Sequence, residues 1–313
     1  MLRCLVHKSK FLGYRNMVIM TNDYITSIPE LNKPHVYIKD KAKVNLIINE
    51  LVNGGQSKLQ VILDFDRTIT KQHDDGVPQV SSFAIFEKCP SLPDTYKMVV
   101  EALNMKYKPI EFDPKIPSAE KKKHMEDWWR LSKQNLAGLS VSYKEIEEVV
   151  RELKPTLRDC CIELFDLLKK NEIPILVFSA GLGQTVIAVL NYYNILHSNV
   201  KVVANFLKYN DQGIIQGFQD ETIINVFNKN ESVLSGTEYY EKLHDRVNAI
   251  VVGDSIGDAN MFSGEQTGCN VLKIGFLYDH AEDNLEGYMK HFDIVLVDDQ
   301  TMHVIHAILN HIF

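Results

Sequence analysis

LQVILDFDRTIT, residues 59–70, joins a short apolar run to a polar turn that carries two aspartates. The run LQVIL is typical of a strand that is buried on both faces of a parallel sheet. Asp64 and Asp66 are two residues apart at the end of this run, so both side chains leave the strand on the same side. The pattern predicts a pair of carboxylates at a strand end, although an acidic strand-to-loop junction without any function would look the same on its own.

More apolar runs follow along the chain, and helical patterns separate most of them. One helical stripe covers 40–51 and ends at Asn53-Gly54-Gly55, and others cover 157–168 and 184–191. This alternation predicts an α/β fold, in which a parallel sheet carries helices on both faces. The further predicted strands are 173–178 (IPILVF), 201–206 (KVVANF), 249–252 (AIVV), 271–274 (VLKI) and 294–297 (IVLV).

The alternation stops between residues 71 and 155, where helical patterns occur without a convincing buried strand. Two helices expected there cover 118–137, with Met125, Trp128 and Trp129 on an apolar stripe, and 143–153. We therefore expect a helical cap at 71–155 that is inserted into a core made of 40–70 and 156–313. Residues 1–39 are expected to be a leader that need not be ordered.

The composition is that of an ordinary globular protein and excludes several classes of partner. The 313 residues are 45% hydrophobic and 24% charged, and 34 basic against 41 acidic side chains give a net charge of −7. Such a chain lacks the excess of lysine and arginine that binding to nucleic acid requires. No apolar run approaches the ~18 residues that span a bilayer. We therefore expect neither a nucleic-acid partner nor a membrane-embedded segment.

The cysteines and the N-terminal residues give indications of the cellular compartment in which the protein works. Five cysteines without a Cys-x-x-Cys spacing fit neither a disulfide framework nor a zinc site, and they favour a reducing compartment. The first 22 residues contain no acid but carry Arg3, Lys8, Lys10 and Arg15, as mitochondrial presequences do. A disordered leader explains this composition equally well, and we expect a cytoplasmic protein.

Three more segments place polar residues where an open α/β sheet has its ligand crevice, just after predicted strands. SAG at 179–181 follows one strand, and its small residues let backbone N–H groups approach an anion. Lys229 follows the apolar pair at 226–227, and GDSIGD at 253–258 follows 249–252. Taken singly, SAG is also a plain strand-to-helix turn and most such lysines lie at the surface. Two acids four residues apart at a strand end are less common as pure structure.

In chain order, these four segments resemble the motifs of the haloacid dehalogenase superfamily of phosphohydrolases. The resemblance implies a Rossmann-like core, and it implies that the insertion is the type 1 cap of this superfamily. It also implies a Mg²⁺ ion held by Asp64, Asp254 and the backbone carbonyl of Asp66, with Asp258 acting from outside the inner shell. Carboxylate and carbonyl oxygens are the ligands that Mg²⁺ prefers.

The same resemblance implies a role for each motif. Asp64 would attack the phosphorus, and Asp66 would protonate the leaving alkoxide and later activate water. Ser179 and the backbone at Ala180 would bind the phosphoryl oxygens, and Lys229 would neutralise developing charge while it holds the nucleophile. Because a phosphate monoester dianion repels a carboxylate, the site needs this positive charge before attack can occur.

Further segments are similar to the cytosolic 5′-nucleotidase III family. This family comprises pyrimidine 5′-nucleotidases and 7-methylguanosine phosphate-specific 5′-nucleotidases, so the resemblance implies a nucleoside 5′-monophosphate as substrate. The segments are IEFDP at 110–114, MEDWW at 125–129, VFSAG at 177–181, HSNVKVV at 197–203, VFNK at 226–229 and IVLV at 294–297.

Three cap residues are candidates for binding the base. Glu111 matches the base-contacting glutamate of the family, and it suits 7-methylguanine and cytosine alike. Trp129 resembles the 7-methylguanosine-preferring branch, and a charged base stacked on it would gain about 2 kcal/mol or more when desolvated. Phe83 is either the other face of an aromatic sandwich or ordinary cap core. Trp128 is expected to pack between cap helices, because adjacent helical residues project about 100° apart.

These features predict a monomeric, magnesium-dependent 5′-nucleotidase that hydrolyses 7-methyl-GMP and pyrimidine nucleotides such as CMP through an aspartyl-phosphate. Transfer of the phosphoryl group to a nucleoside is an expected side activity. The alternative enzyme is a capped phosphatase of the same superfamily that acts on a non-nucleotide phosphomonoester. A receiver-like phosphoacceptor module also forms an acyl phosphate, but it needs neither Asp66 nor a cap. A non-catalytic nucleotide binder is a further alternative, although every catalytic residue type is intact.

Overall fold

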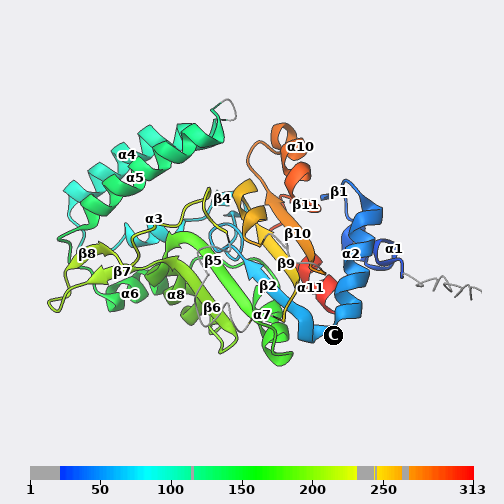
Figure 1. Cartoon of the computed structure of the whole chain (residues 1–313). Coiled ribbons are helices and arrows are strands. Elements are labelled where there is room, and N and C mark those ends of the chain that lie inside the picture. Colours follow the sequence, from blue (N-terminus) through cyan, green and yellow to red (C-terminus); the bar gives the residue numbers. More distant parts are fainter. Residues whose placement is uncertain (1–21, 114–115, 231–242, 244, 263–267) are drawn as a thin grey trace, which may run out of the picture.

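A seven-stranded sheet forms the centre of the computed structural model, which describes residues 22–113, 116–230, 243, 245–262 and 268–313 (Figure 1). The strand order is β1-β11-β10-β9-β2-β5-β6, and every neighbouring pair is parallel except β1 with β11. The α/β fold and all six predicted strands are confirmed. The bounds are β1 Val36–Ile38, β2 Leu59–Leu63, β5 Ile175–Leu182, β6 Val200–Asn205, β9 Asn248–Gly253, β10 Asn270–Leu277 and β11 Ile294–Val297.

Both faces of the sheet are buried, which explains why the strands are continuous apolar runs. In β9, Ile250 and Val252 belong to the main core, whereas Ala249 and Val251 pack on the opposite face. The main core is shared with α2, α7, α8 and α11, and α10 packs on the other side near β11. The helix bounds are α2 Lys41–Gly54, α7 Cys161–Lys170, α8 Gly183–Tyr192, α10 Ala281–His291 and α11 His303–Leu309.

Residues 22–39, which the sequence assigns to a leader, carry regular structure. They form α1 (Tyr24–Ser27), the 3-10 turn η1 (Pro29–Asn32) and β1, and Val36 of β1 pairs with Leu296 at the edge of the sheet. Ile28 and Leu31 are buried in the main core. Elements of three or four residues are too short to give a periodic pattern, so the sequence gives no signal for them. The basic segment that resembles a presequence lies outside the described residues.

The inserted segment divides into two parts with different neighbours. α4 (Asp94–Phe112) and α5 (Ser118–Leu136) form an antiparallel pair that stands apart from the sheet (Figure 1). α5 also packs against the hairpin of β7 (Leu207–Tyr209) and β8 (Ile215–Phe218). By contrast, α3 (Ser82–Phe86) and α6 (Tyr143–Leu153) pack against α8 of the core, and the short hairpin β3 (His73–Asp74) and β4 (Val77–Pro78) precedes them.

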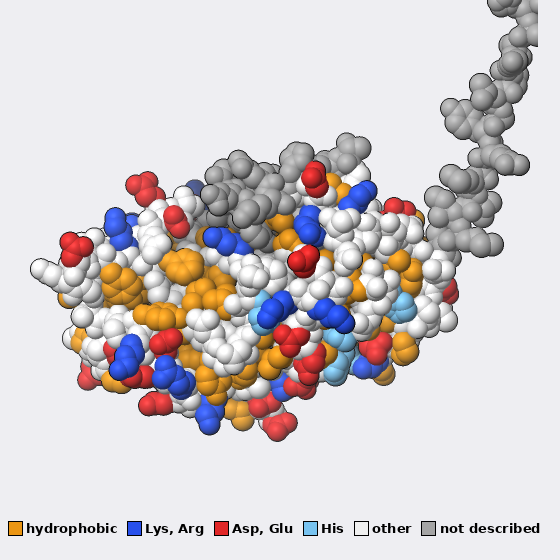
Figure 2. Space-filling model, turned by 90° about the horizontal axis from the view of Figure 1, so that it is seen from below, with side chains coloured by type: hydrophobic (Ala, Val, Ile, Leu, Met, Phe, Trp, Pro, Cys, Tyr) orange, Lys and Arg blue, Asp and Glu red, His pale blue; other side chains and the backbone are white. Residues whose placement is uncertain are grey.

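The described surface is mixed in charge. On the face shown in Figure 2, acidic and basic side chains lie among one another and among apolar ones. This part of the surface therefore presents no extended field of one sign. Among the helices that the structure describes, none has the length and apolar character needed to cross a membrane.

Candidate active site

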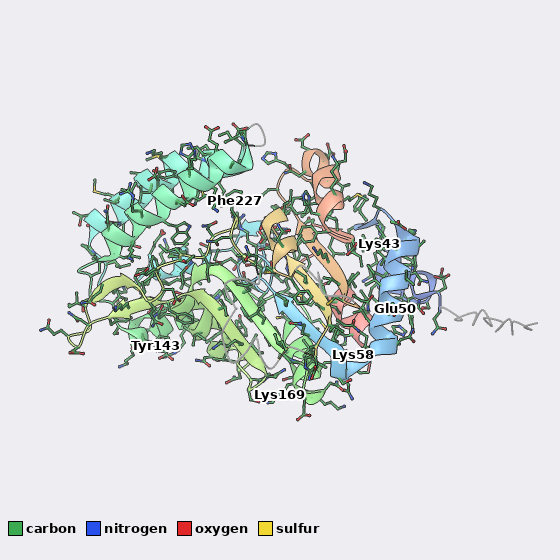
Figure 3. All side chains as sticks on the ribbon, viewed as in Figure 1. Lys43, Glu50, Lys58, Tyr143, Lys169 and Phe227 are labelled. Atoms are coloured by element: carbon green, nitrogen blue, oxygen red, sulfur yellow. The ribbon has the colours of Figure 1, made fainter. Side chains whose placement is uncertain are left out.

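A pocket of about 910 Å³ lies between the carboxyl ends of the central strands and the α4–α5 pair. Phe227, which lines it, is labelled in this region in Figure 3. Because parallel strands end at one edge of a sheet, β2, β5 and β9 bring residues that are far apart in sequence to one place. All ten predicted site residues line this pocket, namely Asp64, Asp66, Phe83, Glu111, Trp129, Ser179, Ala180, Lys229, Asp254 and Asp258.

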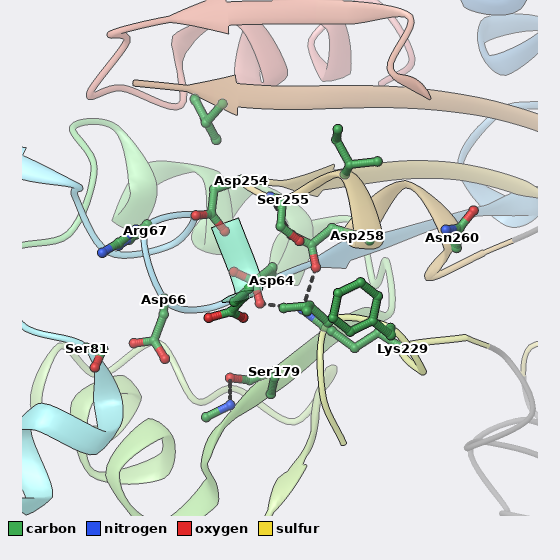
Figure 4. A pocket seen from close by; sticks show the side chains of 18 of the residues that line it. Asp64, Asp66, Arg67, Ser81, Ser179, Lys229, Asp254, Ser255, Asp258 and Asn260 are labelled. Atoms are coloured by element: carbon green, nitrogen blue, oxygen red, sulfur yellow. Dashed lines mark hydrogen bonds and ion pairs between the residues drawn. The ribbon is translucent and has the colours of Figure 1, made fainter. Parts of the chain in front are cut away.

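Lys229 bridges two of the predicted carboxylates (Figure 4). Its Nζ lies 2.5 Å from Asp64 Oδ1 and 2.6 Å from Asp258 Oδ1, and the lysine is only 3% exposed. Burial lowers the pKa of Lys229, but the two carboxylates outweigh burial and raise the pKa above its ordinary value. For Asp64, burial has the opposite effect: it raises the pKa to about 7, although the ammonium group of Lys229 lowers it. Lys229 is therefore a fixed positive charge beside the predicted nucleophile.

Three carboxylates converge around this lysine and suit a hard divalent cation. Oxygens of Asp64, Asp254 and Asp258 all lie within 4.8 Å of one another. Burial raises the pKa of Asp254 well above its ordinary value, and the charges of Asp64 and Asp258 raise it further. The charge of one lysine cannot balance three acids at such short range. An all-oxygen donor set with excess negative charge fits Mg²⁺, with Asp64 and Asp254 as the side chains that would hold it.

Asp258 is occupied by other partners, as a residue acting from outside the inner shell would be. Its Oδ1 accepts from Lys229, and its Oδ2 accepts from both the backbone N–H and the hydroxyl of Ser255 at 2.9 Å. Gly257 makes this arrangement possible, because a Cβ there would come within 2.0 Å of the carbonyl oxygen of Val226. The second glycine of the GDSIGD segment thus lets the lysine-bearing loop pack against the acidic turn.

Asp66 is held by a residue that the sequence did not single out. Its Oδ1 accepts from the backbone N–H of Ser82 and its Oδ2 accepts from the Ser82 hydroxyl, each at 2.6 Å. Burial raises the pKa of Asp66, and both hydrogen bonds from Ser82 act against this rise. Ser82 carried no signal, since it lies in a loop-and-helix segment without a motif and reaches the site only through the fold.

Ser179 lines the pocket and is 1% exposed. Its hydroxyl oxygen accepts from the backbone N–H of Gly181 at 2.9 Å, as the dashed line in Figure 4 marks. The hydroxyl hydrogen is therefore available to an acceptor in the pocket. Ala180, the residue between them, also lines the pocket.

Of the aromatic residues in the inserted segment, some lie as the sequence predicts and others do not. Trp128 stacks on Tyr107 of α4 with centroids 5.6 Å apart, so its predicted packing between the helices of this segment is confirmed. Trp129 lines the pocket, but it contacts Phe83 directly, with ring centroids 5.3 Å apart and planes 57° apart. A base between two rings needs about 7 Å, because each stacking contact takes about 3.5 Å. In this arrangement Phe83 and Trp129 leave no room for a base between them, which favours the other interpretation of Phe83, that it is ordinary core of the inserted segment.

Two further observations concern the surroundings of Trp129 and Glu111, the residues expected to face the base. Phe218 of β8 also contacts Trp129, edge to face, with ring centroids 6.0 Å apart and planes 74° apart. Burial raises the pKa of Glu111, and Lys108 and Arg67 lower it. Glu111 and Trp129 come from different helices of the α4–α5 pair and line the same pocket.

Comparison with known proteins agrees with this geometry. Residues 67–313 match the sequence profile of the pyrimidine 5′-nucleotidase (UMPH-1) family. The chain belongs to this family. The 7-methylguanosine phosphate-specific 5′-nucleotidases of Drosophila melanogaster and Homo sapiens are 48% and 35% identical to it, and the matches cover 91% of this chain and 90% and 95% of those proteins.

A solved structure gives the same result at the level of the fold. The crystal structure of cytosolic 5′-nucleotidase IIIB bound to cytidine matches with a TM-score of 0.88 and 48% identity, covering 92% of this chain and 97% of that chain. The predicted resemblance to the cytosolic 5′-nucleotidase III family and the predicted enzyme class, a 5′-nucleotidase, are therefore confirmed.

A second residue of this 5′-nucleotidase family member escaped the sequence argument. Arg158 is 2% exposed and donates Nε to the carbonyl oxygen of Thr68 at 2.8 Å, and its other nitrogens bind the carbonyl oxygens of Arg67 and Asp299. Its guanidinium also lies 3.6 Å over the ring of Phe276. The arginine thus fixes the backbone directly after Asp66. Burial lowers the pKa of Arg158 to about 10.

Proposed function

We propose that this chain is a magnesium-dependent 5′-nucleotidase that hydrolyses 7-methyl-GMP and pyrimidine nucleotides such as CMP. The observation that carries the proposal is the Asp64–Lys229 contact beside the acid cluster, in the same pocket as Glu111 and Trp129. The names of the fly and human relatives support the first substrate, and the cytidine-bound structure of the similar nucleotidase supports the second.

The first half of the reaction transfers the phosphoryl group to the protein. An oxygen of Asp64 forms a bond to phosphorus, the P–O5′ bond breaks, and its electron pair stays on O5′. A proton from the carboxyl group of Asp66 neutralises this alkoxide and releases the nucleoside. Lys229 holds Asp64 at 2.5 Å and balances charge on the transferring group, and the hydroxyl of Ser179 donates to a phosphoryl oxygen.

The second half returns the protein to its starting state. Asp66 takes a proton from water, the water oxygen attacks phosphorus, and the bond between phosphorus and Asp64 breaks to give inorganic phosphate. Asp64 and Asp254 would hold Mg²⁺ together with the backbone carbonyl of Asp66. When bound, the ion supplies positive charge that lets an anionic nucleophile approach an anionic substrate. If a nucleoside hydroxyl replaces the water, the same step becomes phosphotransfer.

The base is recognised by the α4–α5 pair. The positive charge of 7-methylguanine favours stacking on Trp129, and the carboxylate of Glu111 can accept from an amino group of either base. In this proposal residues 71–155 act as the specificity cap, and the enzyme works as a monomer in the cytoplasm. The word cytosolic in the name of the similar solved nucleotidase supports that location.

Steady-state hydrolysis of 7-methyl-GMP, GMP, CMP and UMP, measured side by side, tests the proposal. We expect 7-methyl-GMP and CMP to be hydrolysed well, and Trp129→Ala to lower the kcat/KM ratio of 7-methyl-GMP to CMP by about 10-fold or more. Trp128→Ala is the matched control, because it removes the neighbouring indole, which packs on Tyr107. That variant should lower stability and leave the ratio unchanged.

Other outcomes would favour the alternatives. An even, low activity on all four nucleotides would indicate a phosphatase for a different phosphomonoester. Nucleotide binding without release of phosphate would indicate a non-catalytic binder, and a long-lived acyl phosphate on Asp64 would indicate a phosphoacceptor module. An unchanged substrate ratio in Trp129→Ala would contradict the stacking argument alone.

A further inference from the structure

Ser82 makes an unusually complete set of contacts with one carboxylate. Its backbone N–H and its hydroxyl bind the two different oxygens of Asp66, each at 2.6 Å. The backbone N–H of Leu182 donates to Ser82 Oγ at 3.2 Å. Since that N–H can only donate, it occupies an acceptor position of the Ser82 oxygen, and the single hydroxyl hydrogen is directed to Asp66. Two hydrogen bonds from one residue, one to each oxygen, thus fix the plane of the Asp66 carboxylate.

This contact lies in a buried, well-packed part of the molecule. Ser82 has no exposed surface, and α3, on which it lies, packs against β5, α6 and α8. Gly181 leaves the room that the contact needs, because a Cβ there would come within 2.0 Å of Ser82 Oγ and 2.7 Å of Asp66 Oδ2. Two segments that are about a hundred residues apart are therefore shaped around the same pair.

We propose that Ser82 is a positioning residue for acid–base catalysis: it holds the Asp66 carboxyl group in the orientation that delivers a proton to the leaving oxygen. This inference rests on the proposed function. In the step concerned, the P–O bond breaks, its electron pair stays on the leaving oxygen, and the proton moves from Asp66 to that oxygen. With both oxygens of Asp66 bound by Ser82, only the remaining lone pairs can carry the proton, and their direction is set.

The dependence of kcat/KM on the leaving group tests this role, because a purely structural role of Ser82 would not change that dependence. A ribose alkoxide and a phenolate are poor leaving groups that benefit from protonation, whereas p-nitrophenolate is a stable anion that leaves without a proton. Ser82→Ala removes the hydroxyl and keeps the backbone contact, so the carboxyl group gains rotational freedom. We expect kcat/KM to fall by about 10-fold or more for phenyl phosphate and CMP, and by less than about 3-fold for p-nitrophenyl phosphate.

Two other variants separate positioning from folding. Ser81→Ala removes the N-cap of the same helix, where Ser81 Oγ accepts from the backbone N–H of Ala84 at 3.3 Å. We expect it to change the values for the two aryl phosphates by the same factor. Ser82→Cys retains the size of the side chain but has a weaker donor, so its leaving-group dependence should fall between wild type and Ser82→Ala. Thermal unfolding of each variant shows that it is folded.

The outcomes distinguish this inference from the proposed function. Equal losses for phenyl and p-nitrophenyl phosphate in Ser82→Ala would overturn the positioning role, and so would an increase in rate, which would mean that Ser82 holds Asp66 away from the reaction. The two aryl phosphates test Ser82 whatever the natural substrate is. A wild-type protein that hydrolyses both aryl phosphates but neither CMP nor 7-methyl-GMP would overturn the nucleotidase proposal instead.

Discussion

Lys229→Met should destabilise the metal-free protein strongly, because among the residues that the structure describes it removes the one cation in contact with Asp64 and Asp258. All three residues are almost fully buried, with side-chain exposures of 2%, 7% and 1% for Lys229, Asp64 and Asp258, and the two contacts measure 2.5 and 2.6 Å. Breaking a buried ion pair from one side costs about 3–5 kcal/mol. Protonating one stranded aspartate of ordinary pKa at pH 7.5 costs about 5 kcal/mol, which sets the upper limit for each acid. Methionine fills a similar volume, so a cavity contributes little.

Urea unfolding in buffer with EDTA measures this loss, and a matched variant calibrates it. Lys43→Met removes an ion pair of similar length, 2.7 Å to Asp293, from a lysine that is 59% exposed. We expect Lys43→Met to lower the free energy of unfolding by less than about 1 kcal/mol, as exposed pairs do. Lys229→Met should lose about 3–5 kcal/mol, and saturating Mg²⁺ should return about 2.7 kcal/mol at a concentration 100 times its Kd.

A loss below about 1 kcal/mol for Lys229→Met in EDTA would refute the charge argument, since it would show that the acids need no cation. A loss that Mg²⁺ does not reduce would refute the assignment of the acid cluster as the metal site. Adding Asp64→Asn to Lys229→Met removes one stranded charge and should recover part of the lost stability.

Three further outcomes follow from the site. Asp64→Asn should reduce kcat to background, because the amide cannot form the acyl phosphate, while circular dichroism shows an intact fold. Removal of metal with EDTA should abolish phosphate release, and Mg²⁺ should restore it, whereas Ca²⁺ with its longer ligand distances should not. Arg158→Lys keeps the charge but cannot reach all three carbonyl groups that the guanidinium binds, so the free energy of unfolding should fall by about 3 kcal/mol in urea titration.

The parts of the site that lie at strand ends could be predicted from sequence, because a buried parallel strand leaves a readable apolar run. Asp64, Ser179 and Asp254 each follow or end such a run, and the topology brings them together whatever the loops do. The strand β1 could not be predicted, since three residues paired antiparallel at an edge give no pattern of their own.

Residues that bind the backbone of the site, or that lie in the inserted segment, are not marked by a sequence pattern of this kind. Ser82 and Arg158 reach the Asp66 segment from 16 and about 90 residues away, and neither lies in a recognisable motif. The relation between Phe83 and Trp129 was also beyond the sequence, because ring separation depends on how α3 and α5 pack. Long-range contacts of single side chains therefore account for most of what the sequence missed.

The split of the inserted segment has a consequence for how substrate preference can change. α3, with the serine that binds Asp66, is docked on the core, whereas Glu111 and Trp129 are carried by the separate α4–α5 pair. If Glu111 and Trp129 recognise the base as proposed, substitutions in that pair that keep the contact between Trp129 and Phe83 should alter which base is accepted with little effect on proton transfer. Base preference could then change during evolution through substitutions in α4 and α5, while the residues that carry out the chemistry stay the same. Exchanging residues 94–136 between relatives should accordingly transfer base preference with little loss of turnover.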